Sequence, residues 1–204
     1  LSNMASELNK LGENLFNVRQ SKIPLLENKV KNLLSRLGMQ ESEFVVQLDF
    51  INDFTNYGMD KLLLKFSANK GIAPEPIEKV ASGGELSRLM LALKSIIAAQ
   101  NYLPTLIFDE IDMGVSGNIA AQMAELLSEM SMNHQVIVIT HLPQIAAKAK
   151  YHIFVEKKTD TSTTRSVFKY LSNEERIMSI ASMLSSENIL DTAIDTAKQL
   201  LNQS

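Results

Sequence analysis

Apolar residues spaced three and four positions apart dominate the first 37 positions of the chain. They form two stripes separated by Pro24, whose members are Leu1, Met4, Leu8, Leu11, Leu15 and Val18, then Leu26, Val30, Leu33 and Leu37. The spacing is typical of the a and d positions of a coiled coil, and a helix of this length would reach ~55 Å at ~1.5 Å per residue. We therefore predict that residues 1–40 are the end of a coiled coil, with a kink or a fresh start at Pro24. The alternative is a pair of amphipathic helices packed on a domain.

After this stripe the pattern changes to short runs that are typical of β-strands. Gly38 is placed to cap the helix, and residues 44–50 and 61–66 are predicted as strands joined by a turn at residues 56–58. Two strands with a tight turn between them predict a hairpin. Residues 68–78 are rich in glycine and proline and predict a surface loop.

Two further apolar runs lie at residues 105–108 and 136–139, on either side of a helical pattern over residues 118–132. Neither run alternates with polar residues, which is typical of strands covered on both faces. A helix that joins two such strands predicts a parallel βαβ unit. A helix over residues 85–101 precedes the unit.

The rest of the chain continues the mixture of strands and helices. Residues 151–156 and 166–171 predict a second hairpin at the edge of the sheet, and residues 174–184 and 189–201 predict two amphipathic helices. The predicted fold class is α/β, with a coiled-coil helical segment at residues 1–40 and a globular part over residues 41–204.

Composition narrows the class of protein. The 204 residues include 45% hydrophobic and 21% charged residues, which is typical of a globular protein and not of a disordered one. No apolar run approaches the roughly 20 residues of a membrane helix, and the net charge of −3 provides no general attraction to nucleic acid. The absence of cysteine excludes disulfides and thiolate metal sites, and we expect a cytoplasmic protein. Because the chain starts inside a helical pattern, we also expect that it was cut from a longer polypeptide.

The stretch Ser82-Gly83-Gly84-Glu85 opens the helix predicted near residue 85. A hydroxyl and two glycines at a helix start direct bare backbone N–H groups toward an anion, so this stretch predicts a phosphate site. The alternative is an ordinary N-cap, with a buried apolar stripe in the helix that follows.

Polar side chains follow both strands of the predicted βαβ unit. Asp109 and Glu110 end the first strand, and Thr140 and His141 follow the second. Open α/β sheets bind their ligands at this edge. The alternatives are that the two carboxylates cap the next helix or pair with lysines, and that His141 is a satisfied surface residue.

Three strings together resemble a known family. They are Val-Ala-Ser-Gly-Gly-Glu-Leu-Ser-Arg-Leu-Met-Leu-Ala-Leu-Lys, Phe-Asp-Glu-Ile-Asp-Met-Gly-Val-Ser-Gly and Thr-His-Leu-Pro-Gln-Ile-Ala. Over residues 1–170 the chain resembles the C-terminal half of an ABC-type ATPase head, a P-loop NTPase-like parallel sheet with flanking helices. The strings are most similar to SMC-like coiled-coil ATPases of DNA repair.

The resemblance implies a role for each motif. Ser82, Gly83, Gly84 and Glu85 would be the signature motif, which contacts the ATP bound by the opposite head. Asp109 would end the Walker B strand and hold Mg²⁺ through a water molecule. Glu110 would be the catalytic carboxylate that polarises the attacking water, and His141 would be the switch histidine that contacts the γ-phosphate.

The resemblance also implies partners and a function. The partners are the N-terminal head lobe of the same protein, a second head in a homodimer, and DNA, with no membrane. The function is ATP hydrolysis in recombinational repair of double-strand breaks, at a cytoplasmic, nucleoid-associated location.

The sequence departs from the ABC pattern at two places. No G-x-x-x-x-G-K-[ST] loop occurs in the chain, so the residues that grip the α- and β-phosphates are absent and the isolated chain is expected to bind ATP weakly or not at all. Ser116 stands where ABC heads usually have an aspartate after the catalytic glutamate.

Two alternative functions remain open. One is a non-hydrolysing module for dimerisation or assembly, and the other is the head of another SMC-type or transporter-type ABC ATPase.

A basic cluster surrounds the second hairpin and consists of Lys148, Lys150, Lys157, Lys158, Arg165 and Lys169. These residues either contact DNA phosphates or protect a strand edge from pairing, and we favour the edge interpretation.

Overall fold

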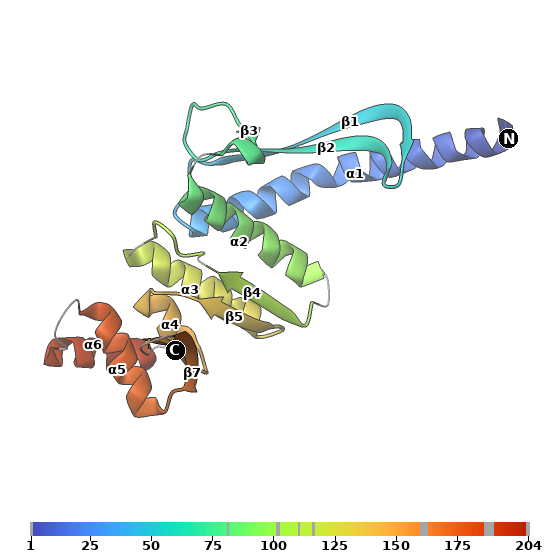
Figure 1. Cartoon of the computed structure of the whole chain (residues 1–204). Coiled ribbons are helices and arrows are strands. Elements are labelled where there is room, and N and C mark those ends of the chain that lie inside the picture. The colour runs from blue at the N-terminus through green and yellow to red at the C-terminus, as the bar shows by residue number, and fades with distance from the viewer. Residues whose placement is uncertain are drawn as a thin grey trace. The chain divides into compact units, whose positions relative to one another are not determined.

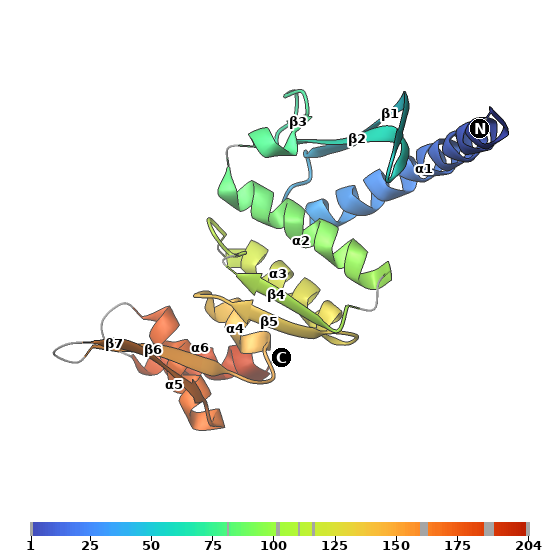
Figure 2. The same ribbon diagram turned by 45° about the vertical axis from the view of Figure 1, so that its right-hand side comes forward.

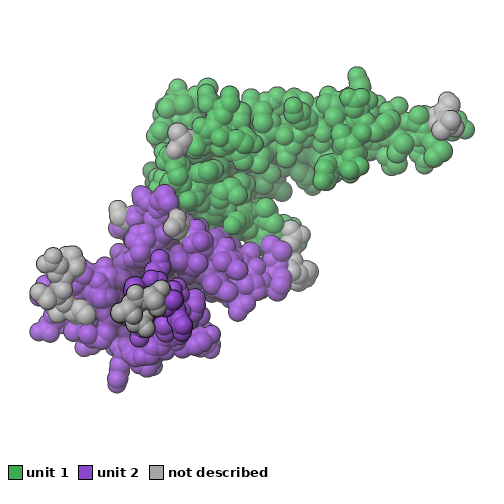
Figure 3. Space-filling view, in the orientation of Figure 1, with its two compact units in different colours: residues 1–102 green, residues 103–204 purple. Residues whose placement is uncertain are grey.

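The computed structural model describes residues 2–80, 82–100, 103–109, 111–115, 117–159, 163–185 and 190–202. The chain divides into two compact units, residues 1–102 and residues 103–204 (Figure 3). Each unit is therefore described by itself. Among the described residues, no helix has both the length and the apolar character needed to cross a membrane.

The first unit begins with one long helix. Helix α1 (Ser2–Arg36) passes through Pro24 without ending, so the predicted fresh start and the alternative of two separate helices are wrong. A proline costs the helix one hydrogen bond, but packing along the helix retains the helical path on both sides. The helix ends as predicted at Gly38, whose φ of 77° suits glycine. The N–H of Met39 donates to the Leu34 carbonyl at 2.9 Å, which is the Schellman arrangement.

The predicted hairpin follows α1 and lies along it in both views (Figures 1 and 2). Strand β1 (Glu43–Thr55) pairs antiparallel with β2 (Gly58–Ser67). Several contacts between described residues attach the hairpin to α1. The rings of Phe16 and Phe50 meet edge to face at 5.4 Å, and the N–H of Val46 donates to the Glu27 carboxylate at 2.8 Å.

Arg19 forms a third attachment between α1 and the hairpin. Its Nη1 donates at 2.7 Å to both carboxylate oxygens of Asp60 and to the carbonyl of Tyr57. The Asp60 side chain is only 6% exposed, whereas that of Arg19 is 37% exposed. Arg19 therefore neutralises a carboxylate that the fold has removed from water.

The region that was predicted as a loop contains two short elements. Strand β3 (Glu75–Pro76) pairs with β2, and a 3₁₀ turn (Ile77–Lys79) follows it. Helix α2 (Gly83–Gln100) then begins two residues earlier than predicted.

The two stripes of α1 have different surroundings. In the second stripe Val30 and Leu37 are fully buried, and Leu26 and Leu33 are half-buried. Helix α1 contacts α2, whose buried residues include Leu89 and Leu91. The first stripe is exposed, with Met4, Leu8, Leu11, Leu15 and Val18 each at least 38% accessible. The second stripe therefore contributes to the core of this unit, whereas the first stripe stays exposed.

The second unit contains the predicted parallel βαβ unit. Strand β4 (Thr105–Asp109) pairs in parallel with β5 (Gln135–Ile139), and α3 (Gly117–Ser131) joins them. Helix α4 (Pro143–Lys148) follows β5. Leu106 and Phe108 are buried, but Ile107 is 61% exposed. The prediction that both faces of this strand are covered is therefore wrong for the described residues, because α3 covers only one face.

The last part of the chain forms a separate small layer. Strands β6 (Ile153–Thr159) and β7 (Thr164–Tyr170) pair with each other as an antiparallel hairpin. Among the described residues this hairpin is a two-stranded sheet of its own and not the predicted edge of the parallel sheet. Helices α5 (Asn173–Leu184) and α6 (Asp191–Asn202) pack with α4 around a buried cluster whose members are Ala147, Ile180, Ala181, Ala193 and Ala197.

His152 lies between α4 and the β6–β7 hairpin. Burial lowers its pKa from the usual 6.5, and the nearby Arg176 guanidinium lowers the pKa further. Hydrogen bonds with the backbone of Ala146 and Ala149 oppose this shift without cancelling it. The Nε2 atom is buried and has no hydrogen-bond partner in the part of the chain that the structure describes. The fold therefore favours the neutral imidazole.

The Arg19 attachment gives a stability prediction. Replacing Arg19 with Ala leaves the Asp60 carboxylate buried without its cation, and we expect the free energy of unfolding to fall by about 1–3 kcal/mol. Urea unfolding of both proteins measures this difference. The control is Lys22→Ala, an exposed position on the same helix, which should change stability by less than about 0.5 kcal/mol. Equal effects of the two substitutions would show that the ion pair does not stabilise the hairpin.

The environment of His152 gives a pH prediction. Since its pKa is lower in the folded than in the unfolded chain, the unfolded chain binds more protons once the pH falls past about 6.5. The stabilisation from neutral His152 is therefore complete at pH ~7.5 and declines as the pH approaches the folded pKa. We expect the free energy of unfolding to fall between pH ~7.5 and ~5.5 in the native chain and to fall less in His152→Gln. Identical pH slopes for the two proteins would contradict this assignment.

Candidate functional site

The predicted site residues lie in both units. Ser82, Gly83, Gly84 and Glu85 open α2 in the first unit, whereas Asp109 and His141 lie in the second. Glu110, the predicted catalytic carboxylate, and Ser116 lie outside the described residues. The geometry of the two groups is therefore described separately.

Ser82 is the N-cap of α2. Its carbonyl accepts the first intrahelical hydrogen bond, from the N–H of Leu86 at 3.1 Å. The N–H groups of the first turn, including Gly83 and Gly84, have no acceptor within the helix, and the macrodipole makes this end positive. Ser82 and Gly83 are exposed, so an anion can reach these donors. The geometry fits both an N-cap and a phosphate site, because the free backbone N–H groups of an exposed helix start can donate to a phosphate.

Arg88 lies one turn into α2. It is half-buried, and its Nε is fully buried with no hydrogen-bond partner among the described residues. Arg88 is therefore not a fully solvated helix charge.

The second group lies at the carboxyl ends of β4 and β5. The parallel register pairs Asp109 with Ile139, so Asp109 and the segment Thr140-His141 leave the sheet at the same edge. Asp109 is exposed, and the His141 side chain is 75% exposed. Two of the three predicted residues at this edge are therefore on adjacent strand ends and accessible to a ligand.

Asp112 is a member of this group that the sequence analysis did not single out. Its side chain is 2% exposed, and its Oδ2 accepts hydrogen bonds from the Thr140 hydroxyl and from the N–H of His141 at 3.2 Å. The Nδ1 atom of His141 is 3.4 Å from the same oxygen. The only signal in the sequence is a charged residue among the apolar side chains Ile111, Met113 and Val115.

The donor set at this edge suits a magnesium ion only in part. Among the described residues, no three His, Cys, Asp or Glu side chains are close enough to form a metal site on their own. Asp109 offers one exposed hard oxygen ligand, and Mg²⁺ in nucleotide sites is usually held by one or two carboxylates together with water and phosphate oxygens. The residues present therefore fit a shared magnesium site and not a self-sufficient one.

Two glycines after β4 have backbone conformations that suit a turn. Gly114 has φ of 69° and Gly117 has φ of 56°, which L side chains rarely adopt. Gly114 lies between the end of β4 and the start of α3, and Gly117 is the first residue of α3.

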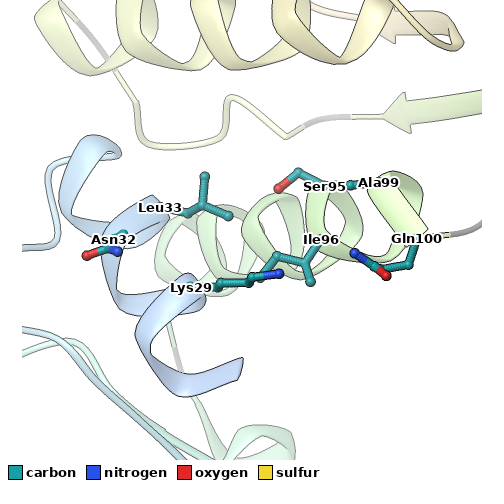
Figure 4. A pocket seen from close by; sticks show the side chains of 7 residues that line it. All are labelled: Lys29, Asn32, Leu33, Ser95, Ile96, Ala99 and Gln100. Carbon is teal, nitrogen blue, oxygen red and sulfur yellow. The ribbon is translucent and has the colours of Figure 1, made fainter. Parts of the chain in front are cut away.

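The cavities of the two units lie away from these residues. One of about 300 Å³ lies between α1 and α2 in the first unit (Figure 4), lined by Lys29, Asn32, Leu33, Ser95, Ile96, Ala99 and Gln100. It contains no acid and one cation, so it offers no catalytic group. A second, of about 350 Å³, lies between α5 and α6.

The basic cluster near the second hairpin is partly neutralised. Lys148 pairs with Glu125 at 2.9 Å, Lys158 approaches Glu156 at 3.5 Å, and Lys169 pairs with Glu175. The Lys169 ammonium is also the largest cause of the lowered pKa of Glu175. Pairing with neighbouring acids lowers the net positive charge of the cluster, which favours the strand-edge interpretation over a DNA-binding surface.

Comparison of the sequence with known proteins identifies close relatives. No family model matches the chain. It is 40% identical over 198 residues to the DNA repair protein RecN of Rickettsia bellii, 39% identical over 196 residues to RecN of Deinococcus radiodurans, and 34% identical to RecN of Bacillus subtilis. These alignments cover 97%, 96% and 100% of this chain but only 36%, 34% and 39% of the relatives. The chain thus spans little more than a third of the length of the curated relatives it matches.

Solved structures agree on the fold. The Smc head domain with a coiled coil and joint from Pyrococcus yayanosii matches 83% of this chain with a TM-score of 0.61 and 23% identity, and the matched part is 31% of that protein. A chain from a study of ATP-driven dimerization and DNA-stimulated activation of SMC ATPases matches 85% of this chain with a TM-score of 0.56 and 22% identity, over 99% of its own length. At these identities the likeness establishes an SMC-head type of α/β fold.

Proposed function

Because the chain is homologous over nearly its whole length to part of the DNA repair protein RecN, we propose that it is the C-terminal lobe of an ATP-hydrolysing SMC-like head. Residues 41–204 would form the lobe and residues 1–40 the end of the coiled coil. The observation that carries the proposal is the parallel pairing of β4 with β5, which brings Asp109 and His141 to one exposed edge. The similarity of the chain to a solved Smc head domain, with a TM-score of 0.61, is consistent with this α/β arrangement.

The chemistry of this edge suits phosphoryl transfer to water, which requires charge neutralisation and a positioned water molecule more than covalent participation. The exposed carboxylate of Asp109 would hold Mg²⁺ through a water molecule, and the ion would neutralise phosphate charge when bound. Glu110 follows Asp109 in the sequence and would accept a proton from the attacking water as a general base. The exposed ring of His141 would contact the γ-phosphate, and its Nε2 would donate when the imidazole is protonated.

The start of α2 would act on a second nucleotide. Ser82, Gly83, Gly84 and Glu85 would contact the ATP held by the opposite head, through the exposed N–H groups and the positive end of the helix. Two heads would then enclose two ATP molecules in a homodimer, so that each site combines residues of both copies.

Uncovered apolar surface supports a missing lobe. In the described residues β4 and β5 pair only with each other, and Ile107, Ile137 and Ile139 on their open face are 41–61% exposed. Apolar side chains on a sheet face are normally covered by another layer. We infer that the N-terminal lobe of the same protein covers this face and supplies the phosphate-binding loop that the sequence lacks, so that the isolated chain is inactive.

The exposed stripe on α1 supports the coiled-coil assignment. Met4, Leu8, Leu11 and Leu15 follow the a and d spacing and are 38–65% exposed. A second helix laid along this stripe would bury them, as the outgoing strand of a coiled coil does.

The relatives support a proposal for the biological role. We propose that the complete protein couples ATP hydrolysis to engagement of DNA during recombinational repair of double-strand breaks, in the cytoplasm at the nucleoid. The basic cluster of the second hairpin is a weak candidate for DNA contact, since Lys148, Lys158 and Lys169 are paired with acids.

The hydrolytic role of Glu110 can be tested by mixing this chain with the N-terminal lobe and measuring phosphate release. We expect hydrolysis by the native pair and a loss of about a hundredfold or more in Glu110→Gln, with ATP still bound, because the general base is lost while the binding residues remain. Glu129→Gln, an exposed carboxylate on α3, is the matched control and should hydrolyse at the native rate. Absence of hydrolysis by the native pair would instead support the assembly-module alternative.

The sharing of residues between heads can be tested by complementation. In the complete protein, a signature variant Gly84→Asp and a Glu110→Gln variant should each be inactive. Mixed in equal amounts, they should recover about a quarter of native turnover, since half of randomly paired dimers contain one site with both residues intact. No recovery after mixing would mean that the signature acts on ATP within its own head.

A further inference from the structure

Asp112 is a buried carboxylate in the segment between β4 and α3, and its side chain is 2% exposed. Removing a carboxylate from water is costly unless hydrogen-bond donors replace the lost water. The structure provides such donors from the residues that follow β5. The buried carboxylate of Asp112 is therefore held by hydrogen bonds with the segment after β5.

The donors to Asp112 converge on one atom. Its Oδ2 accepts from the Thr140 hydroxyl and from the N–H of His141 at 3.2 Å. The same hydroxyl accepts from the N–H of Leu142 at 3.0 Å. This chain of hydrogen bonds fixes the backbone of residues 140–142 against the segment that leaves β4.

The imidazole of His141 lies against the same oxygen. Its Nδ1 is 3.4 Å from Asp112 Oδ2, while the side chain is 75% exposed. A carboxylate beside one ring nitrogen favours the tautomer that carries its hydrogen there, which leaves the other nitrogen, Nε2, as the acceptor of the neutral ring. A ring that is so exposed adds little to the core, so this buried carboxylate serves the orientation of a surface group.

We propose that Asp112 is a positioning residue for His141, which holds the ring by its Nδ1 side and fixes its tautomer. The inference rests on the proposed function, in which His141 contacts the γ-phosphate. Asp112 then links the segment after β4 to the proposed switch histidine. A movement of that segment would change the position of the His141 ring through this carboxylate. Asp112 acts through His141 and does not itself contact the nucleotide.

The tautomer of His141 tests the proposal. The chain has three histidines, so ¹⁵N-labelled histidine gives three imidazole signals that can be assigned by single substitutions. At pH ~8, where an ordinary imidazole is neutral, we expect the Nδ1–H form of His141 in the native chain. In Asp112→Asn we expect a shift toward the Nε2–H form that free histidine side chains prefer in water. Unchanged signals of His134 and His152 show that the variant is folded.

Two comparisons distinguish positioning from simple stabilisation. Thr140→Val removes a donor to Asp112 but keeps the carboxylate, and it should lower stability while His141 stays in the Nδ1–H form. If Asp112→Asn does not fold, the native spectrum alone decides, since a predominant Nε2–H form of His141 overturns the proposal. An Nδ1–H form that persists in a folded Asp112→Asn variant also overturns it.

Turnover of the complete protein separates this inference from the proposed function. Asp112→Asn should lower turnover about ten- to a hundredfold with little change in KM for ATP, as loss of an orienting partner typically does. A changed tautomer with unchanged turnover would uphold the positioning of His141 and overturn its role in hydrolysis. An unchanged tautomer would overturn the positioning whatever the turnover.

Discussion

The parallel pairing of β4 with β5 is the constraint on which the chemistry of this chain depends. Residues 105–109 and 135–139 pair in register, so the segments that follow the two strands leave the sheet at the same edge. Asp109, Asp112 and His141 come together only for this reason, because 29 positions separate Asp112 from His141 along the chain. Helix α3 makes the parallel arrangement possible, since parallel strands require a crossover between them. An antiparallel pairing of the same strands would place the two polar ends at opposite edges.

Much of the fold could be predicted from the sequence, because local periodicity determines it. Helix α3 and strands β4 and β5 begin and end within one residue of the predicted limits. The predictions failed where contacts between residues far apart in the sequence determine the structure. Pro24 lies inside α1, because the hairpin and α2 hold the helix on both sides of it. The apolar run of β4 predicted two covered faces, but the number of layers on a sheet depends on what else is present, and a strand sequence does not report that.

The sequence predicted two exposed residues of the candidate site, but it did not predict the hydrogen bonds that hold the site together. Asp109 and His141 stand out because a strand pattern ends at each of them. Asp112 carries no such mark. A single charged residue among apolar neighbours is normally predicted to be exposed to solvent. The structure instead buries the Asp112 carboxylate, which accepts a hydrogen bond from the Thr140 hydroxyl. Glu110 and Ser116 lie outside the described residues, so their predicted roles stay predictions.

The exposed apolar faces of the chain and its lack of a phosphate-binding loop have one explanation under the proposed function. The stripe on α1, the open face of β4 and β5, and one face of the β6–β7 hairpin are all uncovered; on the hairpin, Val155 and Phe168 are cross-strand partners that are 54% and 69% exposed. The chain spans little more than a third of the length of its relatives, and under the proposed function the surfaces that cover these faces belong to the rest of the protein. The same chain lacks the loop that grips the α- and β-phosphates. Under the proposed function one absent part accounts for both deficits, since the segment that covers the open sheet would also bring the phosphate-binding loop to the edge where Asp109 and His141 lie.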